Sequence, residues 1–127
     1  MTGQVLVVDD AKVVRTSLGR IMTKCGYSVL EAENGEVGLA VLEANPDVQV
    51  IFLEINMPVM DGMTFLEQLK VRFPDKKRAP VVIVSTETEM SAILKALALG
   101  ASEYVMKPFD EGIIKSKLDI IGVSYQP

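Results

Sequence analysis

Ionisable and hydroxyl side chains stand directly after the apolar runs of this sequence, where they are well placed for chemistry. Asp9 and Asp10 follow one run, Glu54 follows another, and Ser85 and Lys107 come at the ends of two later ones. If the runs are parallel strands, their carboxyl ends lie at one edge of a sheet, where ligands of such sheets bind. We therefore predict that three carboxylates, a hydroxyl and an ammonium converge there.

Three clustered carboxylates need a positive partner. Two unit charges about 4 Å apart cost roughly 4 kcal/mol at an effective dielectric of about 20. The simplest partners are Lys107 and a divalent cation. Mg²⁺ suits this set because it prefers oxygen ligands and binds one or two carboxylates while keeping several waters. The sequence predicts a Mg²⁺ site, with Mn²⁺ as the alternative ion.

Each of these residues also has a purely structural explanation. An Asp-Asp pair after a strand is often a turn and a helix cap. Ser85 would cap a following helix, and Glu54 would be a solvated loop charge. Their joint position at the predicted strand ends favours function, because ionisable groups with perturbed pKa values cluster at functional sites.

The composition excludes several kinds of chemistry. The chain has 127 residues, which fits a single domain spanning 1–127. It contains one cysteine and no histidine. An intramolecular disulfide, a Cys/His zinc site and any mechanism that needs an imidazole are therefore ruled out. The net charge of -4 argues against direct binding to nucleic acid.

The N-terminal segment carries no targeting pattern. Its first ten residues hold one short apolar run with no basic residue before it, which predicts neither a signal peptide nor membrane insertion. We expect a cytoplasmic protein.

Short β-branched runs alternate with longer amphipathic segments along the whole chain, which is typical of repeated βα units on a parallel sheet. The runs expected to be strands are Val5 to Val8, Ser28 to Leu30, Val50 to Leu53, Val81 to Val84 and Tyr104 to Met106. The segments expected to be helices lie around 13–22, 37–42, 65–69, 93–99 and 113–121. The pattern predicts an α/β, doubly wound (βα)5 domain with helices on both faces.

Four stretches together resemble the receiver domain of two-component response regulators, the CheY-like family, over nearly the whole chain. They are VLVVDD (5–10), IFLEINMPVMDG (51–62), VIVST (82–86) and GASEYVMKPF (100–109). The resemblance implies a flavodoxin-like fold with a five-stranded parallel sheet in the order 2-1-3-4-5.

The resemblance also implies a role for each motif residue. The implied residues are, for Mg²⁺, Asp9, Asp10, Glu54 and the backbone carbonyl of Asn56; for the phosphoryl contact and the switch, Ser85, Lys107 and Tyr104; and for the turns, Pro58, Asp61, Gly62 and Pro108. It further implies a cis peptide bond between Lys107 and Pro108, which fits the tolerance of proline for that geometry.

One position departs from the family pattern, because Glu54 stands where the phosphorylatable aspartate is expected. Asp61 is no substitute, since turn chemistry explains it. The extra methylene moves the attacking oxygen by about 1.5 Å. A misplacement of about 1 Å costs about 100-fold in a positioned reaction. We therefore expect a signalling protein, not an enzyme, whose self-catalysed phosphotransfer and dephosphorylation are impaired.

The longer side chain of Glu54 also suggests a phosphomimetic. It would carry a negative oxygen toward Ser85 and Lys107, although a phosphoryl group brings more charge and a third oxygen. A tenfold shift between two states takes only about 1.4 kcal/mol. We hypothesise a partly activated receiver, and the alternative is that Glu54 only blocks phosphorylation. The glutamate is either natural or an engineered replacement of aspartate, and the retention of the other motif residues favours the second origin.

The resemblance also implies partners. The phosphodonor would be a sensor histidine kinase or a phosphotransfer protein. With no output domain expected after residue 121, the output would come from a downstream protein. That protein would bind the face made by the fourth helix, the fifth strand and the fifth helix, which includes Tyr104. We expect a monomer or weak dimer.

Two functions from other classes are the alternatives. A Mg²⁺-dependent phosphohydrolase would use Asp9 as its nucleophile, but nothing in the sequence resembles a substrate cap. A flavin-binding module on the same architecture would need a phosphate-binding loop after the first strand. The acidic Asp9-Asp10 pair would repel a phosphate there unless a metal intervened.

Overall fold

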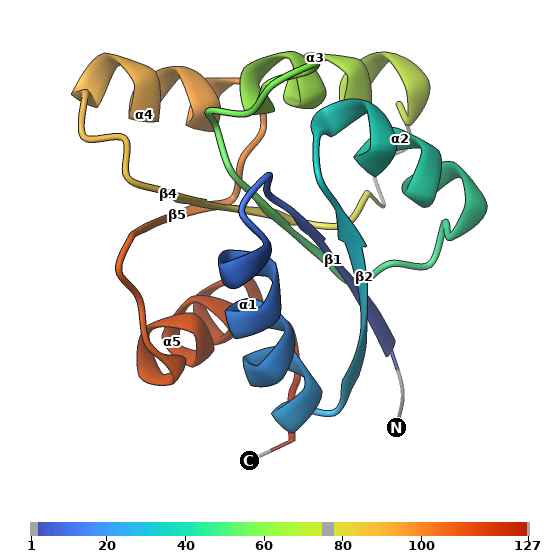
Figure 1. The fold of residues 1–127 in the computed structure, drawn as a ribbon, viewed down its shortest axis with the longest axis vertical. Coiled ribbons are helices and arrows are strands. Elements are labelled where there is room, and N and C mark those ends of the chain that lie inside the picture. The colour runs from blue at the N-terminus through green and yellow to red at the C-terminus, as the bar shows by residue number, and fades with distance from the viewer. Residues whose placement is uncertain (1–2, 75–77, 127) are drawn as a thin grey trace.

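The computed structural model describes residues 3–74 and 78–126, and its strands form one parallel sheet (Figure 1). The elements in chain order are β1 (Gly3–Val8), α1 (Lys12–Lys24), β2 (Tyr27–Ala32), α2 (Gly35–Ala44), β3 (Val50–Leu53), α3 (Gly62–Arg72), β4 (Val81–Ser85), α4 (Met90–Ala98), β5 (Glu103–Met106) and α5 (Glu111–Ile121). The strands pair in the order β2-β1-β3-β4-β5. The predicted doubly wound α/β fold and its strand order are confirmed, and every predicted apolar run lies within a strand.

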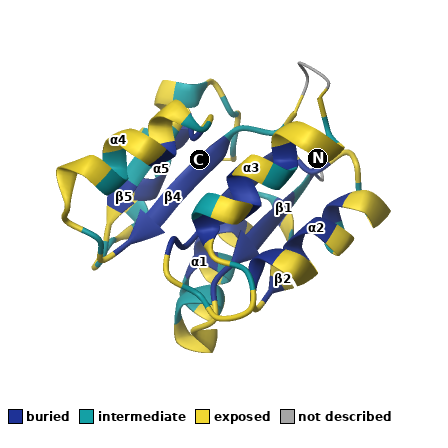
Figure 2. Ribbon diagram, turned by 90° about the horizontal axis from the view of Figure 1, so that it is seen from above, coloured by how far each residue is buried: buried dark blue, intermediate teal, exposed yellow. Residues whose placement is uncertain are grey.

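The helices cover the sheet on both faces, with α1 and α5 on one side and α2, α3 and α4 on the other (Figure 1). Successive side chains of a strand point to opposite faces. In β1, Leu6 and Val8 accordingly pack under α2 and α3, whereas Val5 and Val7 pack against α1 and α5. Every residue of β3 and β4 is buried (Figure 2). This explains why these strands are apolar at consecutive positions.

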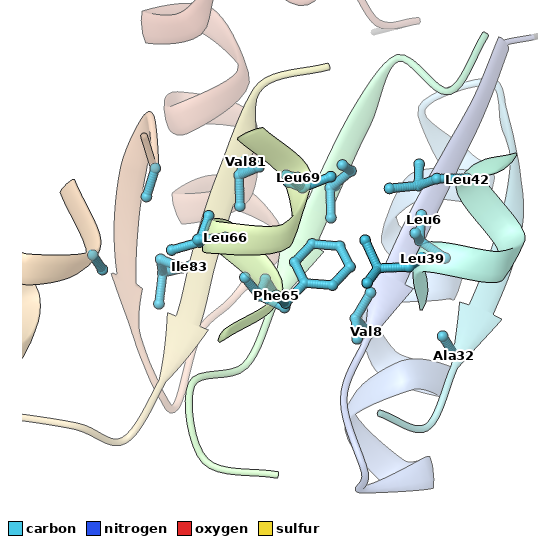
Figure 3. Close-up of a cluster of buried hydrophobic side chains, with 14 of the residues drawn as sticks. Leu6, Val8, Ala32, Leu39, Leu42, Phe65, Leu66, Leu69, Val81 and Ile83 are labelled. Atoms are coloured by element: carbon cyan, nitrogen blue, oxygen red, sulfur yellow. The ribbon is translucent and has the colours of Figure 1, made fainter. Parts of the chain in front are cut away.

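Phe65 of α3 lies at the centre of the larger core, beside Leu39 of α2 and Val8 of β1 (Figure 3). Gly38 allows α2 to come this close, because a Cβ atom there would lie 3.0 Å from the Phe65 ring and 3.1 Å from Val8. Each large side chain buried here contributes roughly 1.5–3 kcal/mol to folding. The packing fixes α2 and α3 on the sheet, and so positions the loops that follow β2 and β3.

None of the helices within 3–74 and 78–126 is both long enough and apolar enough to span a membrane.

Candidate functional site

Three charged side chains from three different strand ends meet at the carboxyl edge of the sheet. Lys107, which follows β5, places its Nζ 3.0 Å from Asp9 Oδ2 after β1 and 2.8 Å from Glu54 Oε1 after β3. Asp9 is 2% exposed and Glu54 is 6% exposed. The parallel sheet thus brings two predicted carboxylates and the predicted ammonium into one pocket, the acidic pocket.

The Glu54 carboxylate uses both of its oxygens. Oε1 accepts from Lys107 Nζ, and Oε2 accepts from the backbone N–H of Ile55 at 2.6 Å and, more weakly, from that of Asn56 at 3.4 Å. Within the described residues no hydrogen bond joins Glu54 to Ser85. The side chain is therefore held between an ammonium and two main-chain amides.

The acidic pocket is short of positive charge. Burial raises the pKa of Asp9, and the hydrogen bonds from the Ala11 N–H and from Lys107 only partly offset this. For Lys107, burial acts to lower the pKa, but its hydrogen bonds to Glu54 and Asp9 outweigh that effect and the pKa is raised. One ammonium therefore faces two buried carboxylates.

Asp10 and Asn56, the other predicted metal ligands, are exposed next to Asp9 and Glu54. The described residues contain no group of three or more acidic, cysteine or histidine side chains arranged to hold a metal ion. The donors still fit Mg²⁺ in kind, because two carboxylates and a carbonyl suffice for an ion that keeps several waters.

Ser85 and Tyr104 meet on a residue that the sequence analysis did not single out, Glu87. The fully buried Ser85 accepts at Oγ from the Glu87 N–H at 3.1 Å. The Tyr104 hydroxyl donates to the Glu87 carbonyl at 2.8 Å. Both contacts use the main chain of Glu87, so its residue type gave no signal. They hold the loop between β4 and α4 against β5.

A series of hydrogen-bonded residues connects the acidic pocket to Tyr104. Glu54 binds the ammonium of Lys107, and the main-chain N–H of Lys107 donates to the main-chain carbonyl of Ser85 at 2.9 Å. Ser85 in turn binds Glu87, which accepts from Tyr104. A change at Glu54 therefore has a contiguous physical route to the aromatic residue on β5.

The predicted turn residues surround this pocket. Asp61 caps α3 by accepting from the Thr64 N–H at 2.9 Å. Gly62 lies so close to β3 that a Cβ atom there would be 2.5 Å from the Glu54 carbonyl oxygen. Pro58 accepts at its carbonyl from the Met60 N–H at 2.7 Å. The Lys107–Pro108 peptide bond is cis.

Val59, in the same loop, has an unfavourable backbone conformation. Its φ is 67° and its side chain is 77% exposed. The left-handed region costs an L-residue roughly 1–2 kcal/mol and suits asparagine far better than a β-branched residue. We expect Val59→Asn to raise the free energy of unfolding by about 1 kcal/mol, measured by urea denaturation followed by circular dichroism.

The matched control is Val71→Asn, at an equally exposed position within α3. Valine and asparagine have similar helix propensities, so this change should alter stability by only a few tenths of a kcal/mol, roughly. Equal effects of the two substitutions would contradict strain at Val59.

Comparison with known proteins gives a consistent result. A family model described as response regulator receiver domain matches residues 5–119. The chain is 34% identical over 120 residues to chemotaxis protein CheY1 of Helicobacter pylori, covering 93% of this chain and 95% of that protein. These matches favour a receiver over the phosphohydrolase and flavin-module alternatives.

Solved structures show the same architecture. Chemotaxis protein CheY4 of Vibrio cholerae superposes with a TM-score of 0.86 at 28% identity, covering 95% of this chain and 99% of that one. A chain in the CheX-CheY-BeF3-Mg²⁺ complex of Borrelia burgdorferi superposes with a TM-score of 0.87 at 27% identity, covering 96% and 90%.

Proposed function

This chain belongs to the response regulator receiver domain family, and from that premise we propose that Glu54 holds it in a partly activated state that phosphorylation does not efficiently control. Receiver domains are signalling proteins, and this chain is CheY-like, of the chemotaxis type within two-component phosphorelays. The proposal concerns what the glutamate does to such a receiver.

The engagement of both Glu54 oxygens carries the proposal. A carboxylate attacks a phosphodonor through an oxygen lone pair, and that oxygen must reach the phosphorus in line with the leaving group. Here Oε1 is bound to Lys107 and Oε2 to the Ile55 amide, with only 6% of the residue exposed. These hydrogen bonds leave each oxygen a second lone pair, but they hold the carboxylate in one orientation, and turning it toward a phosphodonor would cost the contacts with Lys107 and the Ile55 amide. This supports slow phosphorylation.

The same contacts support mimicry. A phosphoryl group on the usual acceptor would present negative oxygens to the lysine of the family motif, and Glu54 presents one to Lys107 at 2.8 Å. Hydrogen-bonded residues lead from Lys107 through Ser85 and Glu87 to Tyr104, whose hydroxyl donates to the Glu87 carbonyl. A permanent charge at Glu54 would favour this arrangement without a phosphoryl group.

Mg²⁺ belongs to the proposal as the pocket's metal. Asp9, Asp10 and the Asn56 carbonyl would hold it, and when bound it would neutralise charge on an approaching phosphodonor. Lys107 would offset the remaining carboxylate charge, because its Nζ already contacts both Asp9 and Glu54. In this arrangement Glu54 itself is tied to Lys107 and the main chain.

The partners follow from the family. A sensor histidine kinase or a phosphotransfer protein would approach the acidic pocket. A downstream protein would bind the face of α4, β5 and α5. That face supports protein binding because Met90, Leu94 and Leu97, spaced along one side of α4, leave apolar surface exposed.

Incubation with acetyl phosphate and Mg²⁺, followed by intact-mass measurement, tests the proposal. We expect no stable phosphorylated species, because the attacking oxygen is misplaced by about 1 Å or more. A stoichiometric gain of one phosphoryl group that peptide mapping assigns to Glu54 would refute it.

A further inference from the structure

Arg15, in the first turn of α1, joins the end of β1 to the edge strand β2. Its Nη1 donates to the main-chain carbonyl of Asp9 at 2.8 Å, and its Nε donates to Glu31 Oε1 at the same distance. Only 15% of the Arg15 side chain is exposed. The planar fork of the guanidinium suits two acceptors that lie in fixed directions.

The carbonyl that Arg15 binds lies just beyond the sheet. The β1 strand ends at Val8, and the Asp9 N–H makes the next bond to β2, to the Ala32 carbonyl at 3.0 Å. The Asp9 carbonyl is left for Arg15. Because a peptide group is planar, fixing this oxygen fixes the whole unit that links Asp9 to Asp10.

The two carboxylates of the acidic motif depend on that peptide to different degrees. The Asp9 carboxylate has its own contacts, from the Ala11 N–H at 2.9 Å and from Lys107 at 3.0 Å. The exposed Asp10 carboxylate makes no hydrogen bond with the described residues. Its position is therefore set mainly by the backbone that carries it.

We propose that Arg15, held in place by Glu31, is a positioning residue that orients the Asp9–Asp10 peptide so that both carboxylates can bind Mg²⁺ together. The inference rests on the proposed use of Mg²⁺ by this pocket. Arg15 contacts neither carboxylate, so its role is geometric. Partners that orient metal ligands in this way are typically worth 10- to 100-fold in metal affinity.

The charge of Arg15 acts in the opposite direction to its positioning role. A positive group beside the pocket repels a cation, although its ion pair with Glu31 reduces this effect. Removing the charge alone would strengthen Mg²⁺ binding, whereas removing the support for the Asp9 carbonyl would weaken it. The direction of the change therefore separates the two roles.

The experiment is a Mg²⁺ titration of the wild-type chain and of Arg15→Met, followed by amide NMR shifts because the chain has no tryptophan. We expect Arg15→Met to weaken binding about tenfold. Arg15→Lys, which keeps the repelling charge but loses the fork, should weaken it at least as much. The control is Arg20→Met, an exposed arginine on the same helix, which should bind as the wild type does. Unchanged or tighter binding in Arg15→Met would overturn the inference.

A second readout without metal separates this inference from the proposed function. The carbonyl ¹³C resonance of Asp9 should shift in metal-free Arg15→Met and stay in place in Arg20→Met. If wild-type protein shows no response to Mg²⁺, the proposed metal use fails, and the ¹³C shift then decides the positioning role alone. An unmoved Asp9 resonance would overturn it, and thermal unfolding checks that each variant is folded.

Discussion

Replacing Glu54 with aspartate is expected to raise the rate of phosphorylation by acetyl phosphate by about 100-fold or more. The shorter side chain withdraws the carboxylate by about one carbon-carbon bond, about 1.5 Å. This breaks the contact between Oε2 and the Ile55 N–H and opens space beside Lys107. The attacking oxygen then lies where Asp9, through Mg²⁺, and Lys107 can offset the charge on an approaching phosphodonor.

Intact-mass spectrometry at successive times, with and without Mg²⁺, measures this rate. The control is Glu54→Gln, which keeps the length of the side chain but removes its charge and its nucleophilic oxygen. Neither wild type nor Glu54→Gln should gain mass. Phosphorylation of Glu54→Asp no faster than that of wild type would mean that the position of the carboxylate is not what limits this chain.

The same three proteins test mimicry through Tyr104. If the Glu54 charge, acting through Lys107 and Ser85, keeps the Tyr104 hydroxyl on the Glu87 carbonyl, the Tyr104 ring resonances of Glu54→Gln should differ from those of wild type. Beryllofluoride with Mg²⁺ should then restore the wild-type Tyr104 ring resonances in Glu54→Asp. The Tyr104 ring resonances of the wild-type chain should stay unchanged. Identical spectra for all three proteins would show that Glu54 only blocks phosphorylation.

The alternation of strands and helices could be predicted because hydrophobic period and strand length are properties of residue type, whereas the strand order was implied only by the family resemblance. The short apolar run from Val50 to Leu53 is typical of a strand buried on both faces, and β3 is one. The convergence of Asp9, Glu54 and Lys107 was predictable for the same reason, since parallel strands end at one edge. The receiver function itself was predicted from the resemblance of four sequence stretches to a known family, which the family match over residues 5–119 supports.

The contacts made through the main chain could not be predicted. Glu54 was expected to reach toward both Ser85 and Lys107, but it contacts only Lys107 and turns its other oxygen to the Ile55 amide. Arg15 was not singled out because its partner at the pocket is a carbonyl, which every residue has. Side-chain rotamers and backbone amides leave no mark in composition or spacing. These features decide how the predicted residues act.

Replacing Lys107 with methionine is expected to lower the free energy of unfolding by about 3 kcal/mol near neutral pH, because two buried carboxylates lose their shared cation. Asp9 and Glu54 side chains are only 3% and 7% exposed, so water cannot replace the ammonium. Methionine has nearly the same length and fills the same space. The loss therefore reports charge, and urea denaturation at several pH values measures it.

The pH dependence has a definite sign. Lys107 lowers the pKa of Asp9, which burial alone holds above its ordinary value of 3.8, so the pKa of Asp9 rises further in Lys107→Met. Between the ordinary pKa of Asp9 in the unfolded chain and its raised pKa in the folded one, the folded state binds more protons than the unfolded state. The free energy of unfolding therefore falls as pH rises through this range. The difference between variant and wild type should accordingly grow as the pH rises above the ordinary Asp pKa of 3.8.

Lys117→Met is the matched control, because Lys117 pairs with Glu103 at 2.7 Å but both side chains are about a quarter exposed, 27% and 24%. A solvated pair of this kind contributes roughly 0–1 kcal/mol. A similar small loss in Lys107→Met, or a loss that does not grow with pH, would contradict the view that the acidic pocket is short of positive charge. A large, pH-dependent loss confined to Lys107 would instead mean that this fold maintains an unfavourable concentration of negative charge. Such a cost is typical of a pocket kept for binding a cation.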